Sequence, residues 1–295
     1  MRTGVIACCV LALSLAPAAS ATAEPADPGG VHAAKKKKKP ARTYPWDARM
    51  KDAVRFARRR AGSVSFAIVD ERGRIHAFNR GRRYHSASLV KAMLLVAYLN
   101  QGGVRNRSLH GADRALLGPM IRVSDNGAAS AVQSRVGLGA MRRLARRAGM
   151  RRFRPNPVWG GSEITARDQA RFFFRIRNLT PRRHRKYALG LLRRIVPGQR
   201  WGIPPGRPKG WSVHFKGGWY PSGGGWRVHQ GALLRRGGRK LGLAVLTEYG
   251  PGYGYGQETI TGVTRRLLRG YNSYPPPGKK KGKGKKPKGQ PSAKR

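Results

Sequence analysis

Residues 84–98 read Tyr-His-Ser-Ala-Ser-Leu-Val-Lys-Ala-Met-Leu-Leu-Val-Ala-Tyr, the longest apolar run beyond the N-terminal segment, and Lys91 is its one charged member. Apolar residues would fall on every side of a helix formed by this stretch, so we expect a buried helix. Ser88 lies three residues before Lys91, which places both side chains on one helix face about a turn apart. The lysine ammonium can therefore reach the serine hydroxyl.

These two residue types in this setting are suited to nucleophilic catalysis. A serine hydroxyl needs a neighbouring base, and a lysine desolvated among apolar side chains loses affinity for its own proton. The helix N-terminus adds backbone N–H groups where a carbonyl oxygen would become negative during acyl transfer. The spacing Ser-x-x-Lys is common by chance, so the apolar setting is what makes Ser88 and Lys91 candidates for nucleophile and base.

The N-terminal segment has the composition of an export signal. Residues 1–23 contain Arg2, then an apolar stretch, then small residues through Ala23, which is typical of a secretory signal peptide. Both cysteines, Cys8 and Cys9, lie inside it, so we expect no disulfide in the mature chain. The sequence therefore predicts a secreted, extracellular and cell-wall-associated soluble protein.

The 295-residue chain carries a formal net charge of +50, much of it near its ends. Residues 24–43 form a basic Lys, Pro and Ala linker, and residues 275–295 form a Lys-rich tail without an acid. Both are predicted to be disordered polycations. For an exported protein the expected partners of these tails are anionic cell-wall polymers or a phospholipid surface, and nucleic acid is a distant third. The alternative is that they only keep the protein soluble.

Residues 44–274 have the pattern of a mixed α and β domain. Gly73 can take the positive φ that a tight hairpin turn requires between two early strands. Besides the Ser88 stretch, helices are predicted over 46–61, 112–123, 127–136, 138–148, 165–176, 180–195 and 257–268, and strands over 64–70, 75–79, 211–216, 226–234 and 241–248. Two early strands are too few for a sheet of their own, so we expect one five-stranded antiparallel sheet with helices on it and a helical insertion beside it.

Two further polar motifs lie at the ends of predicted elements. Ser124-Asp125-Asn126 connects two helices, where it could also act simply as an N-cap, and Lys216-Gly217-Gly218 ends a strand. In this order after Ser88-x-x-Lys91, the motifs resemble those of the active-site serine β-lactamases of class A and their penicillin-binding relatives. The likeness covers about residues 46–271 and includes the runs 84–88, 164–168 and 226–228.

The resemblance implies a two-lobed α/β (α+β) serine β-lactamase-like fold, with a five-stranded antiparallel sheet flanked by helices and an all-helical lobe. It implies that Ser88 is the acylated nucleophile and Lys91 the base that activates it. Ser124 would relay a proton to the leaving nitrogen. Neither a cofactor nor a metal is implied, and the seven histidines show no ligand spacing with carboxylates.

The resemblance also implies the groups that bind substrate. Asn126 would hold both Lys91 and the substrate amide, and Lys216 would attract the substrate carboxylate. The oxyanion hole would be the backbone N–H groups of Ser88 and of Trp219, which follows Gly218 on the strand edge.

Three departures from the family pattern bear on function. Gly217 stands where the family usually has Thr or Ser, which removes a hydroxyl for the substrate carboxylate, and the stretch between Ser88 and Ser124 is short. Class A enzymes hydrolyse the acyl-enzyme with a water that a loop glutamate activates. Here that loop, residues 151–162, is short, and the carboxylate nearest to it is Glu163, which could be the deacylation base or a salt-bridged surface residue.

The sequence therefore leads to three hypotheses. The first is a secreted serine hydrolase that opens β-lactam amides through a covalent acyl-enzyme, with deacylation in question. The second is a penicillin-binding D,D-peptidase-like enzyme that acts on peptidoglycan peptides. The third is a non-catalytic cell-wall-binding module that keeps the fold.

Overall fold

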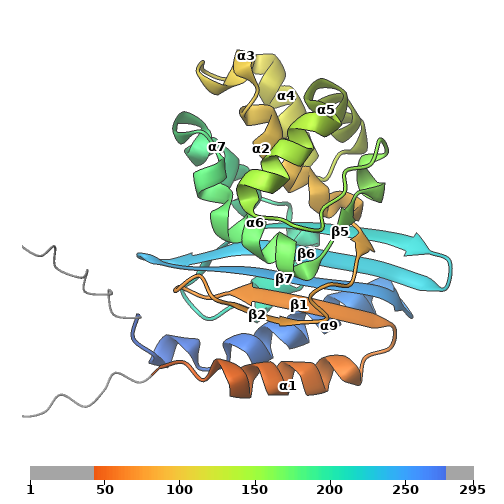
Figure 1. The fold of residues 1–295 in the computed structure, drawn as a ribbon, viewed down its shortest axis with the longest axis vertical. Helices are drawn as coiled ribbons and strands as arrows, with labels where there is room; N and C mark the ends of the chain where they lie inside the picture. The colour runs from red at the N-terminus through yellow and green to blue at the C-terminus, as the bar shows by residue number, and fades with distance from the viewer. Residues whose placement is uncertain (1–42, 277–295) are drawn as a thin grey trace, which may run out of the picture. The chain divides into compact units, whose positions relative to one another are not determined.

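The computed structural model describes residues 43–276, which build a five-stranded antiparallel sheet with helices on both faces (Figure 1). The predicted signal peptide lies outside the described residues, as do the basic linker up to residue 42 and the Lys-rich tail from residue 277. Within the described range, no helix is both long and apolar enough to cross a membrane.

The sheet joins the early hairpin to the three late strands. Its order is β2-β1-β7-β6-β5, and every neighbouring pair is antiparallel. Phe66 lies opposite Val245 where β1 meets β7. The strands are β1 (Ser63–Val69), β2 (Ile75–Phe78), β5 (Ser212–Ser222), β6 (Gly225–Arg236) and β7 (Arg239–Gly250). The prediction of one five-stranded antiparallel sheet is confirmed.

Alternate side chains of the central strands fill two separate cores. Phe66 and Ile68 point into the core beneath α1 (Trp46–Arg58) and α9 (Tyr253–Leu268), which cover one face of the sheet (Figure 1). Ala67 and Val69 belong to the core on the other face, where α6 (Ala166–Leu179) lies on the strands. This alternation is the period-two burial that a sheet covered on both faces requires.

The helical lobe is built around a helix that is buried on every side. All nine residues of α2 (Lys91–Leu99) are buried, as the absence of a polar face predicts. Around it lie α3 (Gly102–Arg105), α4 (Gly111–Arg122), α5 (Asn126–Ala148) and α7 (Arg185–Arg193), and α8 (Ile203–Gly206) lies before the late strands. Gly137 leaves the helical conformation with φ 70°, so α5 consists of the two helices predicted on either side of it.

The start of the Ser88 helix differs from the prediction. Tyr84 and His85 form a short strand, β3, which pairs with β4 (Glu163–Ile164). The next residues, Ala87–Val90, form a 3₁₀ turn before α2. The sequence of the apolar run does not predict this two-stranded ribbon, because β4, the strand that pairs with β3, follows a loop far along the chain. The β3–β4 ribbon thereby ties the loop 151–162 to the approach to Ser88.

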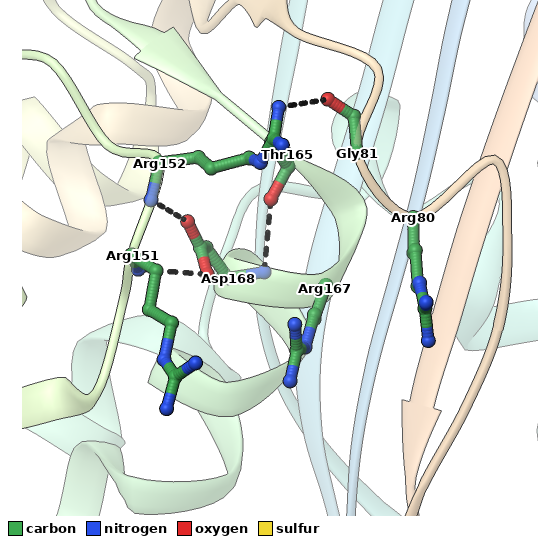
Figure 2. A pocket seen from close by; sticks show the side chains of 7 residues that line it. All are labelled: Arg80, Gly81, Arg151, Arg152, Thr165, Arg167 and Asp168. Carbon is green, nitrogen blue, oxygen red and sulfur yellow. Dashed lines mark hydrogen bonds between the residues drawn. The ribbon is translucent and has the colours of Figure 1, made fainter.

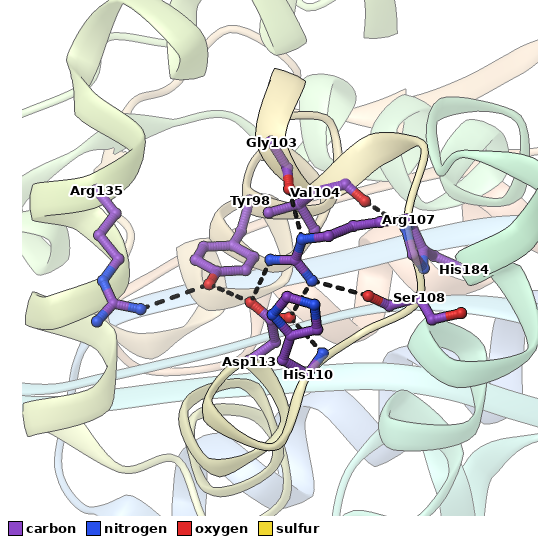
Figure 3. Close-up of polar contacts among 9 residues, drawn as sticks. All are labelled: Tyr98, Gly103, Val104, Arg107, Ser108, His110, Asp113, Arg135 and His184. Atoms are coloured by element: carbon purple, nitrogen blue, oxygen red, sulfur yellow. Dashed lines mark hydrogen bonds and ion pairs between the residues drawn. The ribbon is translucent and has the colours of Figure 1, made fainter.

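A buried carboxylate holds three parts of the helical lobe together (Figure 3). Asp113 on α4 accepts hydrogen bonds from Tyr98 Oη on α2 (2.7 Å) and from the backbone N–H of His110 (2.7 Å). Arg107 Nη1 forms an ion pair with it at 2.6 Å. Hydrogen bonding to Arg107 is the main cause that holds the pKa of Asp113 well below its usual range, and it outweighs the opposing effect of burial.

We predict that Asp113→Asn lowers the free energy of unfolding at neutral pH by about 2 kcal/mol, because it removes charge-assisted hydrogen bonds at a buried site. A carboxylate with a lowered pKa stabilises the folded state above its unfolded pKa, and this contribution is lost as the pH falls. The difference between wild type and variant should therefore shrink below about pH 4. Denaturant unfolding at several pH values checks this. Asp52→Asn is the matched control, since Asp52 is partly exposed and its arginines lie at 3.7–3.9 Å.

Candidate active site

The three sequence motifs meet around the side chain of Ser124. Lys91 Nζ donates hydrogen bonds to Ser124 O (2.5 Å), to Asn126 Oδ1 (2.7 Å) and to Ser124 Oγ (3.3 Å). Lys216 Nζ donates to Ser124 Oγ from the opposite side, at 3.0 Å. Helix α2, the turn between α4 and α5, and strand β5 thus contribute to one polar centre. Ser124 adopts a left-handed conformation with φ 65°, which non-glycine residues rarely take.

Ser88 lies on the 3₁₀ turn that β5 approaches closely. A Cβ atom on Gly218 would lie 2.9 Å from the backbone nitrogen of Ser88 and 2.6 Å from that of Leu89. Only glycine therefore allows this approach, which brings the backbone N–H of Ser88 beside the strand edge. Ala87, just before Ser88, has φ 44°. Within residues 43–276 no side chain is hydrogen-bonded to the Ser88 hydroxyl, and the hydrogen bonds of Lys91 go to Ser124 and Asn126 instead. The predicted reach of the Lys91 ammonium to the Ser88 hydroxyl is therefore not a hydrogen bond in this structure.

Burial lowers the affinity of both lysines for protons. The pKa of Lys91 falls to about 8 through desolvation, which the charge of Asp125 partly opposes. Desolvation and the nearby charge of Lys91 lower the pKa of Lys216 well below its usual value. A general base works best when its pKa lies near the working pH, so Lys91 has the proton affinity that base catalysis needs.

A buried histidine that sequence reasoning missed holds the chain before Ser88. Thr247 N–H donates to His229 Nδ1 (3.2 Å), so the proton of His229 is on Nε2, which donates to the carbonyl of His85 (3.1 Å). Burial, with a smaller effect of Arg227, lowers the pKa of His229 to about 3 and keeps the ring neutral. His229 also lies opposite Gly218 in the β5–β6 pairing. The same histidine therefore contacts the chain before Ser88 through its ring and pairs with the strand residue that approaches Ser88 through its backbone.

An aromatic ring, rather than a carboxylate, faces Lys91 from the short loop. The centre of the Trp159 ring lies 4.5 Å from Lys91 Nζ. Its Nε1 donates to Ser130 Oγ on α5 (3.2 Å), and its carbonyl accepts from Ser86 Oγ (3.2 Å). Gln133 on α5 also donates to the carbonyl of residue 156 at 3.0 Å. The loop is thus tethered on two sides with Trp159 over the base. A single tryptophan in a short loop gives no sequence signal for this.

Glu163 forms its ion pairs outside this centre. Its carboxylate lies 3.4 Å from Arg83 Nε and 3.7 Å from Arg154 Nε, and within residues 43–276 it forms no hydrogen bond with Ser88, Lys91 or Ser124. Its backbone pairs with Arg154 and His85. The structure therefore places Glu163 where a salt-bridged residue would lie, at the junction of the loop with β3.

The ring of Trp201 explains why residue 217 is a glycine and lacks the side-chain hydroxyl that the family usually has there. A Cβ atom on Gly217 would lie 3.0 Å from two atoms of the Trp201 ring, so a larger residue would force Trp201 to move. Gln230, opposite Gly217, fixes this segment because it donates to the carbonyl of Trp201 (2.8 Å) and accepts from Ile203 N–H (2.5 Å).

The ring of Trp201 is part of an aromatic cluster. It packs against Trp219 with ring centres 6.0 Å apart and against Tyr253 at 5.8 Å, and Trp226 lies 5.6 Å from Tyr253. The sequence showed that residue 217 lacks a hydroxyl, but it did not predict that the aromatic cluster of Trp201, Trp219 and Tyr253 lies beside this position. We call this cluster the aromatic wall. Within residues 43–276, no cluster of three or more His, Cys, Asp or Glu residues is arranged to hold a metal ion.

The two-lobed fold, with a buried lysine and a second lysine converging on one serine, defines a serine acyl-transfer enzyme. The chain belongs to the β-lactamase enzyme family, whose model matches residues 113–271. The matched region contains the second and third motifs and begins after the Ser88 turn. Membership makes the protein a serine hydrolase of the β-lactamase and penicillin-binding class.

Solved structures with the same fold include β-lactamases and a penicillin-binding protein. A β-lactamase from Sphaerobacter thermophilus DSM 20745 has 22% sequence identity and a TM-score of 0.65, and the alignment covers 79% of this chain and 100% of that one. PBP-A has 17% identity, a TM-score of 0.63 and coverage of 79% and 99%. A class A β-lactamase from Mycobacterium abscessus has 19% identity, a TM-score of 0.62 and coverage of 76% and 99%. No curated protein sequence matches the chain.

We predict that the rate constant for acylation by a penicillin rises with pH to a plateau above about 8, because Lys91 accepts a proton only when it is neutral. Asp125→Asn should move the midpoint to lower pH, since the charge of Asp125 raises the pKa of Lys91. The asparagine oxygen can still accept from Ala128 N–H, which Asp125 caps at 2.7 Å. Rates measured from pH 6 to 10 check both statements. An unchanged or higher midpoint in the variant would contradict this assignment of the base.

Proposed function

We propose that Ser88 is acylated by β-lactams, and by the related D-alanyl-D-alanine bond of peptidoglycan peptides. The observation that carries this proposal is the double contact of Lys91 Nζ with Ser124 and Asn126, beside the Ser88 turn. Such a constellation supplies a base, a proton relay and an amide-binding group in one place. A purely non-catalytic module would not require an ammonium group to be buried at this cost.

We propose the following steps for acylation. Neutral Lys91 takes the proton of Ser88 Oγ, and the oxygen attacks the carbonyl carbon of the substrate. The backbone N–H groups of Ser88 and Trp219 stabilise the oxyanion that forms. The carbon–nitrogen bond then breaks, and Ser124 Oγ passes a proton to the leaving nitrogen. Lys91 returns the proton taken from Ser88 to Ser124 Oγ through their 3.3 Å hydrogen bond, so that both groups regain their starting protonation states. Lys216, 3.0 Å from Ser124 Oγ, attracts an anionic group of the substrate.

We propose further that the acyl-enzyme formed with a β-lactam is hydrolysed slowly. Trp159 covers Lys91 where a water and its base would have to lie, and the carboxylate of Glu163 is held by two arginines. An indole ring cannot take a proton from water. This supports a penicillin-binding, D,D-peptidase-like mode over rapid β-lactam hydrolysis.

Binding of the substrate should depend little on a substrate carboxylate near position 217. The ring of Trp201 fills the place of a hydroxyl there, and the cluster of Trp201, Trp219 and Tyr253 offers apolar contact instead. We propose that the acyl donor presents an apolar or aromatic group to this wall, which would strengthen binding through buried apolar area.

We also propose that the protein is exported after cleavage of residues 1–23, and that its Lys-rich ends hold it on the anionic cell wall. The apolar N-terminal segment and the charge of +50 support this proposal. N-terminal sequencing of protein from the culture medium and from the wall fraction would test it. Retention of residues 1–23, or recovery only from the cell interior, would overturn it.

We predict that a penicillin adds one covalent adduct to the protein, on the peptide that contains Ser88. Intact-protein and peptide mass spectrometry measure the mass and the site. Ser88→Ala should give no adduct, because the nucleophile is absent, while a matched Ser86→Ala change keeps Ser88 and should still be labelled. Labelling of Ser88→Ala at the wild-type rate would contradict the assignment.

We predict that Trp159→Glu shortens the lifetime of the adduct, because it places a carboxylate near the acylated serine. General-base catalysis contributes on the order of a hundredfold. Trp159→Gln is the matched control, with a similar side chain and no base. Both variants should show the same thermal unfolding temperature. Equal adduct lifetimes in the two variants would show that the absence of a base does not limit deacylation.

A further inference from the structure

The folded part of the protein carries many arginines that no acid neutralises. The whole chain has 62 Lys and Arg residues against 12 Asp and Glu. Several of the carboxylates are already paired, among them Asp70 with Arg74, Glu71 with Arg239 and Glu248 with Arg227. The remaining cations must therefore gather where only solvent or a ligand can balance them.

One group of arginines surrounds a hollow beside the start of α6 (Figure 2). Its volume is about 310 Å³, and Arg80, Arg151, Arg152 and Arg167 line it. The carboxylate of Asp168 accepts the backbone N–H groups of Arg151 (3.2 Å) and Arg152 (2.8 Å). Figure 2 shows no hydrogen bond between the Asp168 carboxylate and the guanidinium groups of Arg80, Arg151 and Arg167. Asp168, the one acid that lines this hollow, thus accepts hydrogen bonds from backbone N–H groups and not from the guanidinium groups around it.

A second and larger hollow lies between helices α6 and α7 and the strands β5 and β6. Its volume is about 570 Å³, and six arginines, one lysine and no acid line it. Arg177 comes from α6, Lys186 and Arg193 from α7, and Arg235 from β6. Three elements of the fold, α6, α7 and β6, thus contribute cations to one space.

Arginines of α6 and one lysine of β7 connect the two hollows. Arg171 and Arg175 lie one turn apart on α6, beyond Arg167. Burial lowers the pKa of Arg171, and so do the charges of Arg167, Arg151 and Arg175, against the opposing charge of Asp168. Burial also lowers the pKa of Lys240, together with the charges of Arg175, Arg177 and Arg235. The charge of Arg175 therefore contributes to lowering the pKa values of both Arg171 and Lys240, and Arg175 lies on α6 between Arg167 of the first hollow and Arg177 of the second.

We propose that this cationic track, formed by the two hollows and by Arg171, Arg175 and Lys240, binds a linear polyphosphodiester that carries no bases, of the poly(glycerol phosphate) type. An arginine guanidinium matches a phosphate with two parallel hydrogen bonds, and the track consists almost wholly of arginines. Arg167 and Arg177 are about 15 Å apart along α6, so a chain with several phosphates can bind at once. The ligand would relieve the repulsion among these cations.

The lining of the hollows favours a polymer without bases over nucleic acid. Proteins that bind single-stranded nucleic acid combine basic grooves with aromatic side chains on which bases stack. Neither hollow is lined by Phe, Tyr or Trp. The exposed aromatic side chains Tyr220 and Tyr249 lie on β5 and β7, and they line neither hollow. Between the hollows, the one ring that the described residues place against a cation of the track is Phe174, which is half-buried and lies 4.0 Å from Lys240 Nζ. The two hollows thus offer charge for a phosphate backbone and no aromatic side chain on which bases could stack.

Charge reversal on the track tests the proposal with the full chain. The variant Arg175→Glu, Arg177→Glu, Lys186→Glu changes three exposed cations whose side chains form no hydrogen bond or ion pair within residues 43–276. The control variant Lys51→Glu, Arg142→Glu, Arg146→Glu makes the same change of charge on α1 and α5. Binding of poly(glycerol phosphate) and of oligo(dT) with equal charge is measured by calorimetry at several salt concentrations. Both variants keep the Lys-rich ends, so any difference between them comes from the folded part.

We expect the track variant to bind poly(glycerol phosphate) at least about tenfold more weakly than the control variant, with a salt dependence reduced by about two counterions. Oligo(dT) should bind no more tightly than the phosphate polymer. Equal losses of affinity for poly(glycerol phosphate) in the two variants would contradict the proposal that the track is the binding site. If oligo(dT) bound more tightly than poly(glycerol phosphate), and the track variant lost this binding while the control variant kept it, the ligand would be nucleic acid and the proposed ligand class would be wrong. Acylation of Ser88 should be equal in both variants, which separates this proposal from the proposed function.

Discussion

The burial of the Lys91 ammonium group is the constraint on which the site depends. Lys91 has no exposed surface and lies on a helix that is apolar all round. A charge in such a place is costly unless hydrogen-bond acceptors surround it. Ser124 O, Ser124 Oγ and Asn126 Oδ1 are these acceptors. The turn between α4 and α5 must therefore take the left-handed conformation at Ser124 that directs its carbonyl to Lys91. Lys91, Ser124 and Asn126, for which we propose the roles of base, relay and amide-binding group, are held together as a consequence.

Strand β5 completes the site by a second constraint, close approach. Gly218 allows the strand to meet the backbone of the Ser88 turn, and the neutral His229 holds the carbonyl before that turn. We propose that the loop over Lys91 decides what happens after acylation. Trp159, anchored to Ser130, places its ring 4.5 Å from Lys91 Nζ, which leaves an apolar group rather than a carboxylate beside this lysine. At Gly217, likewise, the ring of Trp201 lies where the family usually has a hydroxyl.

The sequence predicted the sheet and the motif residues because both depend on local patterns. Strand-like runs separated by glycine-containing turns located all five strands, and the apolar run with one lysine located the buried helix. The sequence could not predict the β3–β4 ribbon, the ring of Trp159 over Lys91 or the ring of Trp201 beside Gly217. Each of these joins segments that are far apart in the chain, and single aromatic residues in loops look the same whether they cover a site or the surface. His229 was missed because a buried neutral histidine reads as an ordinary strand residue.

The central claim is that this site forms an acyl-enzyme and then lacks the means to hydrolyse it. The most direct test follows a chromogenic cephalosporin by stopped flow with the mature full-length protein. The account predicts a burst of one chromophore per protein molecule, followed by a far slower steady release. Rapid linear turnover without a burst would contradict the exclusion of water by Trp159. Absence of both burst and turnover, with the protein folded, would contradict the assignment of Ser88 and Lys91 as an acylating pair.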